Sequence, residues 1–186
     1  MQRVLNGKTA VITGASRGIG AATARRFAAE GANLVLTART LEQHPTLPGS
    51  LNETAHVCRG LGAEVLVIQA DLADEESRLW IIPMALEKFG TINILVNNAV
   101  AAIYKALDQY ALKHRRLMTE INVQAPLDLI QQSLPSMYEV GEGWIINLSS
   151  GSKKHPEGPP YDLGGVRGVY GFYGATKAML DRLTTG

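Results

Sequence analysis

The sequence predicts an α/β fold, with one doubly wound parallel sheet between two layers of helices. Three observations predict it. Short apolar runs alternate along the chain with stretches whose apolar residues recur at helical spacing. The apolar runs are continuous, as they are in parallel strands that are buried on both faces. A glycine-rich turn joins the first run to the first helical stretch, which is typical of the first corner of a three-layer Rossmann-type domain.

The elements follow in a regular order. Strands are expected at residues 8–13, 33–37, 64–69, 92–96 and 143–148. Helices are expected at 18–30, at about 50–61 and 74–89, over a long region of one or two segments at about 107–138, and from about Tyr173. Gly31 ends the first helix, and Pro83 is expected to kink the third. Prolines and glycines mark loops at 41–50 and 151–171, the first of which is a small insertion.

Composition limits the domain count and the partners. A length of 186 residues, with 46% hydrophobic and 19% charged, fits one globular domain over residues 1–186. The net charge of +1 indicates no basic face for nucleic acid, and no apolar run is long enough to span a membrane. The one cysteine, Cys58, cannot form an intrachain disulfide, and the first residues do not resemble a signal peptide. We therefore expect a cytoplasmic protein without nucleic-acid or membrane partners and without a metal site.

The glycine-rich turn runs from Thr13 to Gly20 and has the sequence Thr-Gly-Ala-Ser-Arg-Gly-Ile-Gly. Gly14, Gly18 and Gly20 permit a tight turn and a close backbone approach, and the N–H groups that open the next helix can hold a pyrophosphate. Glycine clusters also occur in turns that bind nothing, and this spacing differs from the common Gly-x-Gly-x-x-Gly fingerprint. The strand before the turn and the helix after it favour a nucleotide site.

Two side chains near the C-terminal end form a candidate proton-transfer pair. Tyr173 and Lys177 are four residues apart, so they share one face of the expected helix. A lysine cation beside a phenol favours the phenolate and lowers the phenol pKa from about 10 toward the range of a general acid or base. Such pairs are also common on ordinary amphipathic helices, and the motifs upstream favour the chemical interpretation. Tyr170 is rejected as the acid or base, because the residue four positions later is Gly174.

Five motifs lie at the ends of expected strands or on the helices between them. They are the turn at 13–20, Asn97-Asn98-Ala99, Asn122, Ser149-Ser150, and Tyr173-Gly-Ala-Thr-Lys177. In this order they resemble the short-chain dehydrogenase/reductase family, and the resemblance covers nearly the whole chain. It implies an oxidoreductase that interconverts a carbonyl and a secondary alcohol by hydride transfer with a nicotinamide cofactor. Residues 38–50 also resemble hydroxysteroid-dehydrogenase-like proteins.

The resemblance implies four catalytic residues. Tyr173 transfers a proton to or from the substrate oxygen, and Lys177 tunes the tyrosine and binds the ribose hydroxyls. Ser150 positions the substrate oxygen, whereas Ser149 is expected to cap a helix or turn. Asn122 lies within a helix, where asparagine is unfavourable, and is expected to hold a relay water at a helix kink. A surface asparagine is the alternative.

The resemblance also implies a set of cofactor contacts. They are Thr13, Gly14, Ser16, Arg17, Gly18, Ile19, Gly20, Arg39, Asp71, Leu72, Asn98, Ala99, Tyr173 and Lys177. An acidic residue after the second strand would hold the ribose 2′-hydroxyl of NAD, whereas arginine accommodates the 2′-phosphate of NADP. The chain has Ala38 and Arg39 there, and Arg17 in the glycine turn, so we expect NADP(H) rather than NAD(H). Solvated surface charge is the alternative role for both arginines.

The chain departs from the family pattern in three places. Val100 stands where the family has a glycine after Asn-Asn-Ala. Tyr173 follows Ser150 by 23 positions, which is longer than the family spacing. Residues 153–167 are therefore expected to form a flap over the site, in which His155 and Tyr161 either contact substrate or belong to a solvated loop.

The third departure concerns the C-terminal part. The sequence ends at Gly186, so the last strands of the sheet and the substrate-covering part are expected to be absent. Two functional hypotheses follow. One is an NADP(H)-dependent oxidoreductase for a small carbonyl or alcohol substrate, and the other is a non-catalytic dinucleotide-binding protein or an inactive fragment of a longer enzyme. The family also implies a homo-oligomer, a dimer or tetramer, for a full-length chain.

Overall fold

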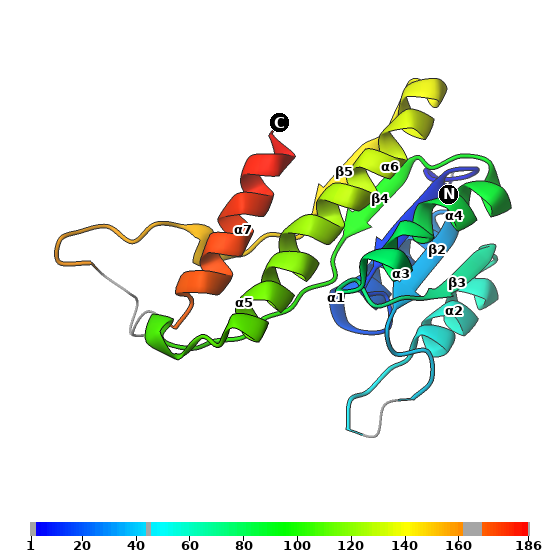
Figure 1. Ribbon diagram of the computed structural model, residues 1–186. Helices are drawn as coiled ribbons and strands as arrows, with labels where there is room; N and C mark the ends of the chain where they lie inside the picture. The colour runs from blue at the N-terminus through cyan, green and yellow to red at the C-terminus, as the bar shows by residue number, and fades with distance from the viewer. Residues whose placement is uncertain (1–2, 44–45, 162–168, 186) are drawn as a thin grey trace.

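The chain folds into a twisted parallel sheet with helices on both faces, as a computed structural model shows (Figure 1). The structure describes residues 3–43, 46–161 and 169–185. The described strands are β1 (Thr9–Thr13), β2 (Asn33–Ala38), β3 (Val65–Gln69), β4 (Ile94–Asn97) and β5 (Trp144–Asn147). They lie in the order β3-β2-β1-β4-β5, and every pairing is parallel. The predicted doubly wound sheet is confirmed, because each expected strand is present with only its ends adjusted.

The helices fill the connections between the strands. In the described chain they are α1 (Gly18–Ala29), α2 (Leu51–Gly60), α3 (Glu75–Leu79), α4 (Ile81–Phe89), α5 (Leu112–Thr119), α6 (Ala125–Val140) and α7 (Gly171–Thr184). A π-helical turn, η2 (Glu120–Gln124), joins α5 to α6, and short 3-10 turns occur at η1 (Leu107–Gln109) and η3 (Gly151–Lys153). None of these described helices is both long enough and apolar enough to cross a membrane.

Two apolar cores lie on opposite faces of the sheet. Because successive side chains of a strand point to opposite faces, Ile12 and Leu36 pack with α1 and α2, whereas Val11 and Val35 pack with α4 and α6. A smaller cluster includes Met118 of α5 and places α7 beside α5 and η2 (Figure 1). Helices thus lie on both faces of the sheet, although Trp144 and Ile146 leave one face of the edge strand β5 exposed. The carboxyl ends of the strands face the same edge.

The predicted third helix is two helices that meet at Trp80, so the expected kink at Pro83 is wrong. Pro83 lies in the first turn of α4, where a missing N–H removes no intrahelical hydrogen bond. Arg78 and Ile81 are buried, whereas Trp80 is 65% exposed. Sequence periodicity alone did not reveal the break, because the apolar pattern continues through it.

Arg78 is a buried cation that joins α3 to the long helical region. Its guanidinium donates to Asp128 at 2.6 Å, to Glu120 at 3.0 Å and to the carbonyl oxygen of Leu72 at 3.2 Å. The arginine is nearly inaccessible to solvent, whereas the two carboxylates are partly exposed. Removing only the cation would leave two like charges close together.

Arg78→Met is expected to lower the free energy of unfolding by about 3 kcal/mol, because it leaves partly desolvated carboxylates without their partner. Urea unfolding followed by circular dichroism measures this loss. Arg26→Met is the control, since Arg26 forms an exposed ion pair with Glu30 and should contribute less than about 0.5 kcal/mol. Equal effects of the two variants would contradict a structural role for Arg78.

Candidate functional site

The glycine turn is held against the loop that follows β4. Gly14 and Gly18 have φ angles of +66° and +56°, which this tight turn requires and which glycine adopts without strain. A Cβ atom on Gly20 would meet the carbonyl oxygen of Gly14 at 2.4 Å. Asn98 donates from Nδ2 to the carbonyl oxygens of Thr13 at 2.9 Å and Gly14 at 3.2 Å. Thr13 Oγ1 in turn accepts from the N–H of Asn98 at 3.0 Å, so turn and loop form one unit.

The N-terminus of α1 is available to an anion. The helix begins at Gly18, and no side chain of the described chain caps it. The first N–H groups of an α-helix have no intrahelical acceptor, and here no N-cap side chain accepts from them either. The helix dipole adds partial positive charge at this end. Ile19 in this first turn is 63% exposed. These features are typical of a phosphate site at a helix N-terminus.

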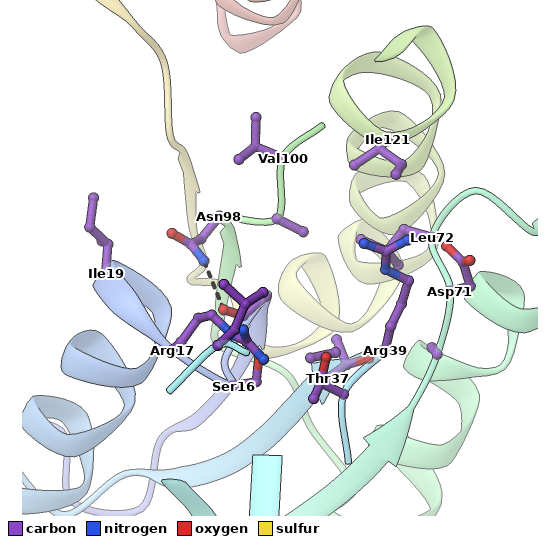
Figure 2. Close-up of a pocket in the computed structure, with 16 residues that line it drawn as sticks. Ser16, Arg17, Ile19, Thr37, Arg39, Asp71, Leu72, Asn98, Val100 and Ile121 are labelled. Atoms are coloured by element: carbon purple, nitrogen blue, oxygen red, sulfur yellow. Dashed lines mark hydrogen bonds between the residues drawn. The ribbon is translucent and has the colours of Figure 1, made fainter. Parts of the chain in front are cut away.

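A cavity of about 500 Å³ opens beside this turn (Figure 2). It lies at the carboxyl ends of the strands, next to β1, where the strand order reverses and ligands bind in open α/β sheets. The predicted cofactor residues that line it are Gly14, Ser16, Arg17, Ile19, Arg39, Asp71, Leu72, Asn98 and Ala99. The other residues predicted as cofactor contacts are not among the lining residues. They are Thr13, Gly18, Gly20, Tyr173 and Lys177.

Several other residues of the cavity wall were not predicted as cofactor contacts. They are Thr37, Ala38, Thr40, Leu47, Ala70, Val100 and Ile121. Thr37, Thr40 and Ala70 lie at or just after strand ends, so they could have been predicted as cavity residues from the expected strands. Leu47 comes from the inserted loop and Ile121 from the π-helical turn, and their positions depend on tertiary packing that a local pattern does not contain.

The two predicted arginines reach the cavity from different sides. In Figure 2, Arg17 lies beside Ser16 near the glycine turn, whereas the Arg39 side chain extends toward Leu72 and Asp71. Arg39 is exposed, and its backbone carbonyl, not its guanidinium, is fixed by the amide of Gln69 at 2.9 Å. The Arg39 guanidinium can therefore adjust to a ligand, as a surface cation at a cofactor site would.

Two buried polar atoms of the cavity wall have no hydrogen-bond partner among the described residues. They are Arg17 Nη1 and Thr37 Oγ1. Leaving such a group unsatisfied costs about 1–3 kcal/mol, and more for a charged group. An anionic oxygen beside Arg17 would remove that cost. The donors, the uncapped helix and the cavity therefore fit a phosphorylated dinucleotide.

A second group of predicted residues gathers around the start of α7. Tyr173 is 8% exposed, and burial raises its pKa while a hydrogen bond with Ser150 opposes the rise. Ser150 Oγ also accepts from the N–H of Ser152 at 3.2 Å and so caps η3. The prediction that Ser149 is the capping serine is wrong, since Ser149 instead hydrogen-bonds Asp181. Consecutive side chains of extended backbone point to opposite sides, which separates the two serines.

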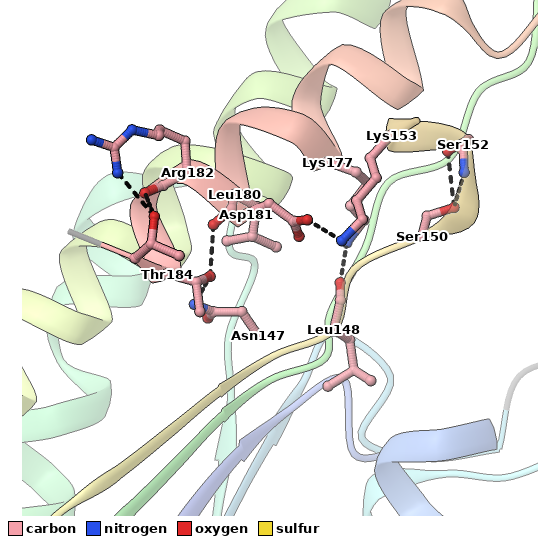
Figure 3. A network of polar contacts seen from close by, with 11 residues as sticks. Asn147, Leu148, Ser150, Ser152, Lys153, Lys177, Leu180, Asp181, Arg182 and Thr184 are labelled. Atoms are coloured by element: carbon pink, nitrogen blue, oxygen red, sulfur yellow. Dashed lines mark hydrogen bonds and ion pairs between the residues drawn. The ribbon is translucent and has the colours of Figure 1, made fainter. Parts of the chain in front are cut away.

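Lys177 lies one helical turn after Tyr173 and is only 2% exposed. Its Nζ donates to the carbonyl oxygen of Leu148 at 2.6 Å, within the network of Figure 3. Burial lowers the pKa of Lys177, and the nearby carboxylate of Asp181 opposes that shift. The expectation that Lys177 lowers the pKa of Tyr173 is not met in this structure, because burial dominates at the tyrosine and the lysine faces a backbone carbonyl.

Asn122 is fully buried in the π-helical turn η2, so it is not a surface asparagine. Its Oδ1 accepts from the N–H of Ala101 at 2.9 Å, and its Nδ2 donates to the Ala101 carbonyl at 2.9 Å. Nδ2 also lies 3.0 Å from Thr176 Oγ1 on α7. Asn122 thus joins the loop after β4 to the helix that carries Tyr173. The π-helical turn is the helix irregularity expected here, and the water relay stays a prediction.

An aromatic group borders the tyrosine. The ring of Tyr104 meets those of Tyr173 and Tyr170 edge to face, with centroids 5.5 Å and 4.9 Å apart. Tyr104 is 52% exposed and therefore presents apolar surface next to the phenol. Tyr104 could not be predicted from a local pattern, because it lies in an irregular stretch between β4 and η1.

The expected flap is described only in part. His155 and Tyr161 are exposed, and their rings contact each other with centroids 5.8 Å apart. Residues 162–168 of this segment, like His44 and Pro45 of the inserted loop, lie outside the described residues. Substrate contact by His155 or Tyr161 stays a prediction.

Comparison with known proteins agrees with this geometry. The family model described as short chain dehydrogenase matches residues 8–186. Hydroxysteroid dehydrogenase-like protein 2 of Danio rerio is 39% identical over 145 residues, and that of Bos taurus is 38% identical over 145 residues. Each alignment covers 78% of this chain and 35% of the relative, so the chain spans about a third of the length of these relatives.

Solved structures of short-chain enzymes share the fold. A metagenomic short-chain oxidoreductase in complex with NADP has a TM-score of 0.83 and 32% identity, over 97% of this chain and 75% of that chain. An alcohol dehydrogenase of Thermococcus sibiricus complexed with 5-hydroxy-NADP has a TM-score of 0.81 and 29% identity, over 96% of this chain and 68% of that chain. With its glycine turn, its cavity and its Tyr173–Lys177 helix, the chain belongs to the short-chain dehydrogenase family of dinucleotide-binding oxidoreductases.

Proposed function

We propose that the chain is the cofactor-binding and catalytic part of an NADP(H)-dependent oxidoreductase that interconverts a carbonyl and a secondary alcohol on a small molecule. The observation that carries the proposal is the buried Tyr173 phenol, hydrogen-bonded to Ser150. Through Asn122, the helix of this phenol is connected to the loop that borders the cofactor cavity. A protein that only bound a dinucleotide would not need this hydroxyl pair.

The side chains supply proton transfer and orientation. Bound NADP(H) would give or take the hydride at the substrate carbon. During reduction the carbonyl oxygen gains electron density, and Tyr173 Oη donates its proton to that oxygen while Ser150 Oγ donates a hydrogen bond to it. Tyr173 keeps its proton at neutral pH, because the ordinary tyrosine pKa of about 10 is already well above 7 and burial raises it. A protonated phenol suits the acid role in reduction. Lys177, one helical turn after Tyr173, would hold the ribose hydroxyls of the bound cofactor.

The proposed preference for NADP(H) over NAD(H) rests on Arg17 and Arg39 at the cavity wall. Arg39→Asp is expected to weaken NADPH binding by about tenfold or more, since it removes a cation and adds a carboxylate near the 2′-phosphate. NADH binding should be unchanged or tighter. Fluorescence titration with each dinucleotide measures both affinities. An unchanged NADPH-to-NADH ratio would show that Arg39 does not recognise the phosphate.

The alternative is a protein that binds a dinucleotide without turning over a substrate. An assay of the 186-residue chain by NADPH absorbance, with a panel of ketones, aldehydes and alcohols, distinguishes the oxidoreductase from this non-catalytic alternative. Turnover supports the oxidoreductase, whereas NADPH binding without turnover supports the non-catalytic alternative or a fragment whose activity needs further chain. The homo-oligomeric state stays a prediction.

A further inference from the structure

We infer that Gly49 is a positioning residue for the cofactor. Its carbonyl oxygen holds the Arg17 guanidinium at the cavity and thereby sets the preference for a dinucleotide that carries a 2′-phosphate. The inference rests on the proposed NADP(H) function and goes beyond it, because it assigns the preference in part to the inserted loop between β2 and α2. Gly49 is not one of the residues that line the cofactor cavity, so it acts through Arg17.

Gly49 passes very close to the glycine turn. Its φ angle is +84°, and a Cβ atom there would meet the carbonyl oxygen of Ser16 at 2.7 Å and Arg17 Cβ at 3.4 Å. The Ser16 oxygen belongs to the backbone of the turn, so it can give way only if the turn moves. Both the conformation and the close approach therefore require glycine at this position.

The end of the loop that contains Gly49 is anchored. Two backbone hydrogen bonds tie the start of α2 to the residues after β2, from Leu51 N to Thr40 O at 3.1 Å and from Asn52 N to Leu41 O at 3.2 Å. Ser50, directly after Gly49, caps α2 by accepting from the N–H of Glu53 at 3.0 Å. These contacts fix the place of the Gly49 carbonyl relative to β2 and the cavity.

The Arg17 guanidinium is held by that carbonyl and by Ser16 Oγ, which accepts from Arg17 Nε at 3.4 Å. Its Nη2 donates to Gly49 O at 3.3 Å, and its Nη1 has no acceptor among the described residues. Arg17 also lines a second cavity of about 220 Å³, with Pro48, Gly49 and Arg25 in its wall. The guanidinium therefore has room to turn away from the cofactor cavity. The Gly49 hydrogen bond fixes the guanidinium against such a movement and engages Nη2 only, so that Nη1 keeps its capacity to donate.

Gly49→Ala tests the inference, with Gly62→Ala as its matched control. Gly62 also has a positive φ, +91°, but its Cβ would meet only the end of the Arg3 side chain, at 3.7 Å. Gly49→Ala should raise the NADPH dissociation constant about tenfold, the value of one hydrogen bond to a charged group, and change that of NADH less than about twofold. Gly62→Ala should change neither. Fluorescence titration gives both constants, and circular dichroism confirms the fold of each variant.

A double-mutant cycle with Arg17→Met shows whether Gly49 acts through the arginine. In the Arg17→Met background, Gly49→Ala should have no further effect on NADPH affinity. Additive effects of the two substitutions on NADPH affinity would overturn the inference. An equal loss of affinity for NADPH and NADH in Gly49→Ala would also overturn it, because that is the result expected if Gly49 has only a structural role. An unmodified chain that binds neither dinucleotide would instead overturn the proposed function itself. A chain that prefers NADPH but does not respond to Gly49→Ala would overturn this inference alone.

Discussion

Tyr173→Phe is expected to lower kcat for carbonyl reduction by about 10³-fold, the usual contribution of a general acid, while the NADPH dissociation constant stays within about twofold. Phenylalanine keeps the ring that packs against Tyr104 and in the cluster with Met118. It removes only the hydroxyl, which would donate the proton to the substrate oxygen. Steady-state assays and a parallel NADPH titration measure the two quantities separately.

Tyr170→Phe is the matched control for this variant. Tyr170 stands three residues before Tyr173, contacts the same Tyr104 ring and is 36% exposed. Its hydroxyl has no proposed part in the chemistry, so turnover should be retained. If Tyr173→Phe keeps the turnover of the unmodified chain, Tyr173 is not the acid and the proposed mechanism is wrong.

The order of strands and helices could be predicted because each signal is local. Continuous apolar runs mark strands buried on both faces, and the expected strands agree with β1 to β5 apart from their ends. The glycine turn could be predicted for the same reason, since a positive φ at Gly14 is a property of one residue. Parallel topology then places the strand ends at one edge, which is why so many predicted cofactor residues line one cavity.

Other features could not be predicted because they depend on partners far away in the sequence. The burial of Arg78 depends on Asp128 and Glu120, which belong to a later region of the chain. The different partners of Ser149 and Ser150 also depend on α7, where Asp181 hydrogen-bonds Ser149 and Tyr173 hydrogen-bonds Ser150. Helical spacing indicated that Tyr173 and Lys177 share a face, but it could not show that Lys177 would reach the Leu148 carbonyl.

The close approach at Gly20 supports the second prediction of large effect. A Cβ atom there would meet the carbonyl oxygen of Gly14 at 2.4 Å and Asn98 Nδ2 at 2.6 Å. Neither atom has room to yield. The Gly14 carbonyl is backbone, and Asn98 Nδ2 is held by its hydrogen bonds to Thr13 and Gly14. An alanine at this position must therefore displace α1 from the turn that is proposed to hold the pyrophosphate.

Gly20→Ala is accordingly expected to raise the dissociation constants of NADPH and NADH by about 10²-fold, since a misplacement of about 1 Å has effects of this size at preorganised sites. Both dinucleotides should lose affinity equally, because the turn is proposed to contact the pyrophosphate that they share. Gly60→Ala is the control, as Gly60 is also helical but has open space where its Cβ would lie. Fluorescence titration of both variants, with circular dichroism to verify folding, gives the comparison. Unchanged affinity in a folded Gly20→Ala variant would mean that the turn does not hold the cofactor, whereas selective loss of NADPH would place the 2′-phosphate, not the pyrophosphate, at this turn.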